Sequence, residues 1–248
     1  MKRLWERFGL GGESPVIRSL LTLNVVLYLI TVLFSADFVT ALLDGPNALT
    51  LVHFGATNSY QWADAKTAIL TTFDQPWRLL TSTFLHGSGL HILLNMYALW
   101  NLGRTVEVVF GARRTLYIYL VSGVLGSIAS VELQTRPLVG VGASGAIMGL
   151  LGATIYFALT LRNQGRRINW GQLLTPVVMT LAYGLMLEGV DNWAHIGGLL
   201  GGGAAGFLAG VPSERQSWKP IVAGALGALL LAILVGLVPL IPWLYKPV

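Results

Sequence analysis

The chain has 248 residues, of which 54% are hydrophobic, only 11% are charged and none is cysteine. The absence of cysteine excludes disulfides, thiol nucleophiles and cysteine-ligated metals. The net charge of +5 is spread among loops without forming a basic patch, so we expect no nucleic-acid partner. A mean hydropathy of +0.66 indicates a polytopic protein of the lipid bilayer.

Seven apolar runs have the length of about 17 to 25 residues that spans a hydrocarbon core. Arg18, at the edge of the first run, is the only charged residue inside any of them. The runs cover residues 16–34, 79–102, 115–131, 138–161, 170–187, 192–211 and 220–244. They predict an all-α fold of membrane-spanning helices.

The first run follows a short basic segment, residues 1–15, which we expect to be a cytoplasmic tail. It precedes the longest loop, residues 35–78, which is large enough to shape an outer surface. With the N-terminus inside, twelve Lys and Arg residues lie on the cytoplasmic side and four on the outside, as the positive-inside rule requires. The first run lacks a convincing cleavage site for a signal peptide. A bacterial inner membrane fits these features.

The second run carries two histidines and an asparagine. Because Gly87-Ser88-Gly89 interrupts a helix, we expect the helix to begin near Ser88 as its N-cap. His91 and Asn95 then lie one turn apart on one helical face. His86 precedes the break, so we expect a structural hydrogen-bonding residue near the membrane surface, away from the face that carries His91.

The fourth and sixth runs contain glycines at nearly regular spacing. They are Gly142, Gly145, Gly149 and Gly152 in the fourth run, and Gly198, Gly202, Gly206 and Gly210 in the sixth. Such stripes let helix backbones approach closely in lipid. Packing alone explains most of these glycines, and it predicts tight contact between the two runs.

The same two runs carry a serine and a histidine, in Gly142-Ala143-Ser144-Gly145 and Ala194-His195-Ile196-Gly197-Gly198. Polar side chains at membrane depth are rare and commonly functional. A serine and a histidine that meet in space form a nucleophile and its activating base. Each residue alone is more readily explained by helix packing.

Topology places these polar residues at one depth. With the N-terminus inside, the second, fourth and sixth runs all pass from outside to inside. Ser144 lies about six residues into its run and His195 about three, so at 1.5 Å per residue both belong to the outer leaflet with His91 and Asn95. Because these four polar residues share one depth and one side of the membrane, a shared site is favoured over separate packing roles.

Two further roles compete for residues near His195. Asp191 lies one turn before it and either orients the imidazole as a third member of a triad or caps the helix. A metal site of His86, His91 and His195 is conceivable, but no carboxylate or thiolate lies at the right depth. We expect neither a metal nor a cofactor.

Several motifs, in order and spacing, resemble the rhomboid intramembrane serine proteases. They are Trp77-Arg78, Thr81, Phe84-Leu85-His86, His91-Ile92-Leu93-Leu94-Asn95, Gly103 with Glu107 and Gly111, and the segments around Ser144 and His195. The resemblance runs from about Trp77 to Gly210. It implies a six-helix core over residues 16–211, with residues 212–248 forming a linker and the extra seventh helix of the six-plus-one subgroup.

The resemblance also implies a function, cleavage of transmembrane segments of other proteins by a Ser-His dyad. Ser144 would be the nucleophile and His195 the general base, while His91, Asn95 and the Ser144 backbone amide look like the oxyanion hole. His86, Gly142, Gly145, Gly198 and Gly202 would support this site, and the long first loop would brace it. Met148 stands where some members have an aromatic residue against the catalytic histidine, and we expect its thioether to fill that space.

Two other classes of protein compete with this hypothesis. An inactive rhomboid-like protein would bind transmembrane clients without cutting them, but the presence of both Ser144 and His195 argues against it. A small-solute transporter would need charged residues or broken helices near mid-membrane, where the runs carry no charge.

Overall fold

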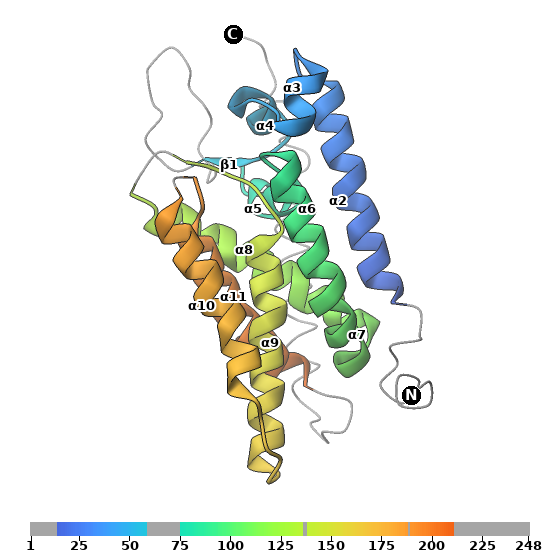
Figure 1. Cartoon of the computed structure of the whole chain (residues 1–248), viewed down its shortest axis with the longest axis vertical. Coiled ribbons are helices and arrows are strands. Elements are labelled where there is room, and N and C mark those ends of the chain that lie inside the picture. Colours follow the sequence, from blue (N-terminus) through green and yellow to red (C-terminus); the bar gives the residue numbers. More distant parts are fainter. Residues whose placement is uncertain (1–13, 59–74, 136–137, 188, 211–248) are drawn as a thin grey trace.

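The computed structural model describes residues 14–58, 75–135, 138–187 and 189–210, which form a bundle of roughly aligned helices (Figure 1). In chain order the long helical segments are α2 (Pro15–Leu33), α6 (Gly89–Ala98) continued by the π-helical turn η2 (Leu99–Gly103) and α7 (Arg104–Phe110), α8 (Ala112–Leu133), α9 (Ser144–Asn163), α10 (Trp170–Met186) and α11 (Asn192–Ala209). Among the described helices, α2, α8 and α9 have the length and apolar composition to cross a membrane. The predicted all-α architecture is confirmed.

The second predicted span differs most from the observed helix. Residues 78–84 form the short helices α5 (Arg78–Thr81) and η1 (Ser82–Phe84), and the long helix runs from Gly89 to Phe110. The hydroxyl oxygen of Ser88 accepts the backbone N–H of His91 at 3.1 Å, which confirms Ser88 as the N-cap. The apolar run thus begins before the helix. Hydropathy does not distinguish the segment before the break at residues 87–89 from the helix that follows it.

The start of α2 depends on a residue far along the chain. Pro15 occupies the first turn, where its missing N–H is not needed. The carboxylate of Glu107 in α7 accepts the amides of Val16 and Ile17 at 3.1 and 3.0 Å. The carboxylate of Glu107 therefore caps the N-terminus of α2 from another helix and links α2 to α7.

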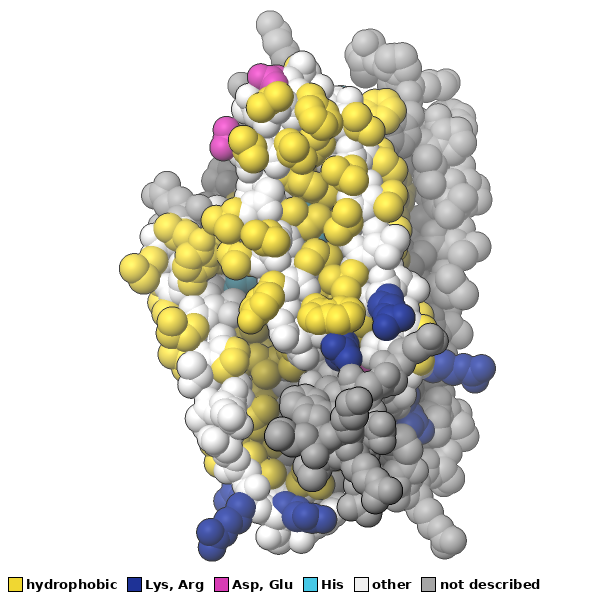
Figure 2. All heavy atoms as spheres, turned by 45° about the vertical axis from the view of Figure 1, so that its right-hand side comes forward, with side chains coloured by type: hydrophobic (Ala, Val, Ile, Leu, Met, Phe, Trp, Pro, Cys, Tyr) yellow, Lys and Arg dark blue, Asp and Glu magenta, His cyan; other side chains and the backbone are white. Residues whose placement is uncertain are grey.

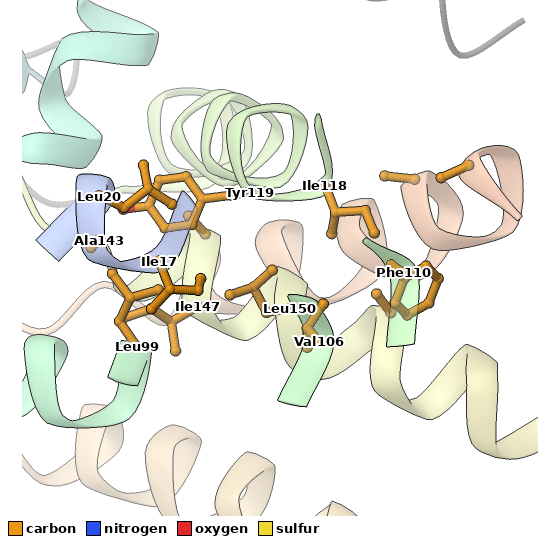
Figure 3. Close-up of a cluster of buried hydrophobic side chains, with 14 of the residues drawn as sticks. Ile17, Leu20, Leu99, Val106, Phe110, Ile118, Tyr119, Ala143, Ile147 and Leu150 are labelled. Atoms are coloured by element: carbon orange, nitrogen blue, oxygen red, sulfur yellow. The ribbon is translucent and has the colours of Figure 1, made fainter. Parts of the chain in front are cut away.

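A cluster of buried apolar side chains joins α2, α7, α8 and α9 (Figure 3). Tyr119 of α8 lies close to Ile17 and Leu20 of α2, and Leu150 of α9 lies between this group and Ile118 of α8. These side chains hold the first half of α9 against the rest of the bundle.

Glycines set the contact between α9 and α11. A Cβ on Gly198 would lie 2.0 Å from the carbonyl oxygen of Gly145, and one on Gly202 would lie 2.0 Å from that of Gly149. A Cβ on Gly152 would likewise meet the Leu199 carbonyl oxygen at 2.0 Å. The two backbones therefore touch directly, which confirms the tight contact predicted from the glycine spacing.

The described part of the first loop folds over one end of the bundle. It contains α3 (Phe38–Leu43), α4 (Ala48–His53) and β1 (Thr57–Asn58), and β1 pairs antiparallel with β2 (Val139–Gly140). The buried guanidinium of Arg78 donates to the Ala56 carbonyl at 2.9 Å and to Gln75 Oε1 at 2.7 Å. Arg78 thereby ties the loop to α5, while the pairing of β1 with β2 joins it to the segment that leads into α9.

The surface separates apolar and charged side chains along the bundle axis. Figure 2 shows hydrophobic side chains over the upper and middle parts, Lys and Arg in the lower half and acidic side chains at the top. Large apolar side chains such as Leu93 and Tyr97 of α6 and Met179 of α10 are more than half exposed. Such a surface suits contact with lipid. Residues 1–13 of the predicted tail and the seventh predicted span lie outside the described residues, and Pro15, the last residue of that tail, begins α2.

Candidate active site

Ser144 is the first residue of α9, which differs from its predicted place six residues into a helix. The residues before it form β2 and then a turn at Gly142, whose φ of +124° is a conformation that side-chain-bearing residues rarely adopt. The Gly142 amide donates to the Ser82 carbonyl at 3.0 Å and holds this turn against η1. The turn places the serine at the helix start.

The start of α9 has no side-chain cap. The first backbone hydrogen bond of the helix runs from the Ile147 amide to the Ala143 carbonyl at 2.9 Å. The amides of Ser144, Gly145 and Ala146 therefore precede the first intrahelical bond and point out of the helix end. That end carries the positive pole of the helix dipole, which favours negative charge.

His195 lies in the first turn of α11, and its side chain meets Ser144. The distance from His195 Nε2 to Ser144 Oγ is 2.9 Å, a normal hydrogen bond. His195 is 5% exposed. The glycine contacts between α9 and α11 hold the two backbones close enough for these short side chains to touch.

Asp191 caps α11, which was one of the two roles considered for it. Its Oδ1 accepts the Ala194 amide at 3.0 Å, and the hydroxyl of Ser130 in α8 donates to its Oδ2. His195 Nδ1 is buried and has no hydrogen-bond partner within the described ranges. The side chains thus form a Ser-His pair without a hydrogen-bonded carboxylate behind the imidazole.

The ring of His91 lies across Gly142, beside Ser144. A Cβ on Gly142 would sit 2.8 Å from His91 Cε1 and Nε2 and 3.7 Å from Ser144 Oγ. Asn95 follows one turn later on α6 and is 6% exposed. The missing side chain at Gly142 is therefore what admits the His91 ring next to the serine.

His86 lies closer to His91 than expected. Its ring is fully buried and packs edge-on against the His91 ring, with 5.2 Å between centroids and 67° between planes. His86 precedes α6, as expected, but the expected hydrogen-bonding role away from His91 is wrong. Its ring contacts His91, and neither of its ring nitrogens has a hydrogen-bond partner within the described ranges. The break at residues 87–89 turns the chain back, so that a residue outside the helix reaches a ring on it.

Met148 is buried in an apolar cluster with Leu151 of α9 and Val177 of α10. Its predicted packing against His195 stays a prediction.

Ser130 and Ser82 were missed as supporting residues, although a serine in an otherwise apolar helix is a signal of interhelical hydrogen bonding. Within the described ranges, no three His, Asp or Glu side chains are arranged to hold a metal ion.

Comparison with known proteins agrees with the resemblance stated above. The family model described as Rhomboid domain matches residues 74–212, more than half of the chain. The chain belongs to the rhomboid family. With its apolar helices, this makes the rhomboid described here an integral multi-pass membrane protein.

Several curated rhomboid relatives align with most of this chain. Rhomboid protease GluP of Bacillus subtilis is 38% identical over 190 residues, which are 77% of this chain and 35% of that protein. RHOMBOID-like protein 4 of Arabidopsis thaliana is 40% identical over 169 residues, 67% of this chain and 39% of its own. Rhomboid-like protease 5 of Toxoplasma gondii is 34% identical over 188 residues, 73% of this chain and 21% of its own. The chain thus spans about a fifth to two fifths of these relatives.

Proposed function

We propose that this rhomboid is an intramembrane serine endopeptidase that cuts peptide bonds in or near transmembrane segments of other proteins. The observation that carries the proposal is the 2.9 Å contact between Ser144 Oγ and His195 Nε2, inside an apolar bundle. A hydroxyl is a weak nucleophile unless a base takes its proton. Rhomboid protease GluP, at 38% identity, supports the same chemistry.

In the proposed first step, Ser144 Oγ attacks the substrate carbonyl while neutral His195 accepts its proton at Nε2. The proton on Nδ1 stays in place, so His195 becomes an imidazolium. It then gives its new proton to the leaving amine, and an acyl ester on Ser144 remains. Water, activated by the same imidazole, hydrolyses this ester and restores the hydroxyl.

The negative charge on the attacked carbonyl oxygen needs donors that are already in place. We assign this role to the Ser144 amide and the side chains of His91 and Asn95. The free amides at the start of α9 and the position of the His91 ring against Gly142 support the assignment. Gly142, Gly145, Gly198 and Gly202 would act by giving the backbones and the His91 ring room to approach.

The charges at the two ends of the bundle support an orientation in the membrane. Basic side chains gather at the end where α9 finishes, and acidic ones at the end that carries α3 (Figures 1 and 2). Under the positive-inside rule, this distribution supports a cytoplasmic N-terminus and a start of α9 toward the outside, in what we propose is a bacterial inner membrane. Partly exposed Ser144 and His91 would meet water from that side.

The proposed core comprises residues 16–211, preceded by a short tail and followed by a linker with a seventh helix. Its substrates would be transmembrane segments that unwind easily, with small residues at the cut and Gly or Pro nearby, because such helices cost less to open. Equal cleavage of a poly-leucine segment would contradict this preference.

A fluorophosphonate probe tests the proposal, because it labels only an activated serine. We expect the purified protein in detergent to be labelled and to cut at least one member of a panel of single-span proteins. The Ser144→Ala variant should do neither. A folded wild-type protein that is never labelled would favour the inactive, client-binding alternative.

A further inference from the structure

Two adjacent polar residues tie the first turn of α11 to its neighbours. Asp191 accepts the hydroxyl of Ser130 in α8 as well as the Ala194 amide of its own helix. Asn192 Nδ2 donates to the Leu181 carbonyl of α10 at 3.0 Å. Gly184 makes room for this amide, since a Cβ there would lie 2.1 Å from Asn192 Oδ1. The turn that carries His195 is therefore held from two sides.

Asp191 differs from Asn192 in bringing a negative charge to this turn. The charged or titratable side chains placed around His195 are Asp191, one turn earlier on the same helix, and His91 of α6, which lies beside Ser144 and has His86 behind it. From α9 the ring meets the Ser144 hydroxyl. Asp191 thus brings a carboxylate to the helical turn that carries this imidazole.

We infer that Asp191 is a positioning residue whose charge also stabilises the protonated His195 that forms when Ser144 attacks. The inference rests on the proposed function. The carboxylate does not take the proton, because His195 Nδ1 has no hydrogen bond to it through which a proton could pass. It acts through space, one helical turn before the histidine, and so replaces in part the missing third member of a triad.

The magnitude follows from Coulomb's law. At about 6 Å, the separation of side chains one helical turn apart, a unit charge changes the imidazole's proton affinity by roughly tenfold when the effective dielectric constant lies between about 20, typical near a protein surface, and about 80, that of water. Without that charge, the imidazolium formed during attack is less stable and turnover is slower. The imidazole also stays neutral to lower pH, so the acidic limb of the pH–activity profile moves down.

Asp191→Asn is the critical variant, since asparagine keeps an oxygen that can accept the Ala194 amide and an Nδ2 that can donate to the Ser130 hydroxyl, but removes the charge. We expect a roughly tenfold lower kcat, little change in KM, and an acidic limb about one pH unit lower than in the wild type. Asp191→Glu, which restores the charge, should return the acidic limb toward its original place.

Two matched controls separate charge from mechanical support. Ser130→Ala removes the tie to α8 and Asn192→Ala removes the tie to α10, while both keep Asp191. Either variant should lower turnover at every pH without moving the acidic limb. If Asp191→Asn fails to fold, Asp191→Ser, also a helix-capping and neutral residue, provides the same comparison.

The outcomes distinguish this inference from the proposed function. A wild-type protein that neither reacts with the fluorophosphonate nor cuts a substrate would refute the proposed function itself. An active wild type whose folded, neutral Asp191 variant keeps the original kcat and acidic limb would overturn the inference alone. Asp191 would then be a helix cap and no more.

Discussion

Gly198 offers the sharpest test of how the helices hold the proposed dyad. In Gly198→Ala, the new Cβ would lie 2.0 Å from the Gly145 carbonyl oxygen, 2.7 Å from its carbon and 3.0 Å from its Cα. These are backbone atoms, so no side chain can turn aside to relieve the overlap. The helices α9 and α11 must separate by about 1 Å or more before the contact is tolerable.

That separation acts directly on the Ser144–His195 pair, because Gly145 follows Ser144 and Gly198 lies one turn after His195. A hydrogen bond of 2.9 Å lengthened by about 1 Å is lost. Misplacement of reacting groups by this amount costs about 100-fold in rate. We therefore expect kcat to fall by about 100-fold, with a loss of stability of roughly 1 to 3 kcal/mol from overpacking.

Gly203→Ala is the matched control on the same helix. A Cβ there would find its nearest atom, the Gly152 carbonyl oxygen, at 3.7 Å, an ordinary contact. Alanine also favours a helix over glycine by up to about 1 kcal/mol, so this variant should be fully active and at least as stable. Cleavage of a single-span reporter and thermal unfolding in detergent measure both effects. Equal activity of the two variants would refute the claim that backbone contact sets the dyad geometry.

Three further predictions follow from the site and its support. Ser144→Ala and His195→Ala should each abolish cleavage with the unfolding temperature nearly unchanged, whereas Asn95→Ala should cost at most about 100-fold in kcat because the Ser144 amide remains. Cleavage should decline on acidification, since only neutral imidazole accepts a proton; a flat rate from about pH 8 to about pH 4 would exclude His195 as the base. Glu107→Ala should lower the free energy of unfolding by roughly 2 to 3 kcal/mol, because two amides of α2 lose a charged acceptor, and a denaturant titration that shows no loss would contradict this role.

The helical architecture was predictable because lipid leaves few alternatives. An apolar run of about 20 residues must satisfy its backbone internally, so hydropathy alone locates most of the helices. The ends of α8, α9, α10 and α11 differ from the predicted ends by at most six residues. Glycine spacing likewise indicated the contact between α9 and α11, since small residues are the usual means of close approach in lipid.

The errors come from features that hydropathy does not register. Val139 and Val141 are apolar, so the run at residues 138–161 conceals a strand and a turn before Ser144. The local signs of that turn are Gly140 and Gly142, and Gly142 also belongs to the glycine spacing that predicts a helix. The side-chain contact between His86 and His91 was unpredictable for a related reason, because it depends on the path of a break and not on helical periodicity.

The corrected position of Ser144 has a consequence for the chemistry. In the middle of a helix, the amide of a serine is bonded to a carbonyl four residues earlier and cannot serve an oxyanion. At the start of α9 the Ser144 amide has no such partner, so the proposed nucleophile and a proposed oxyanion donor come from one residue. Free amides are costly in lipid, and they are tolerable only where water or a polar ligand reaches them. The turn at Gly142 thus accounts for two requirements of hydrolysis at once, a ready donor and a location at the wet end of the helix.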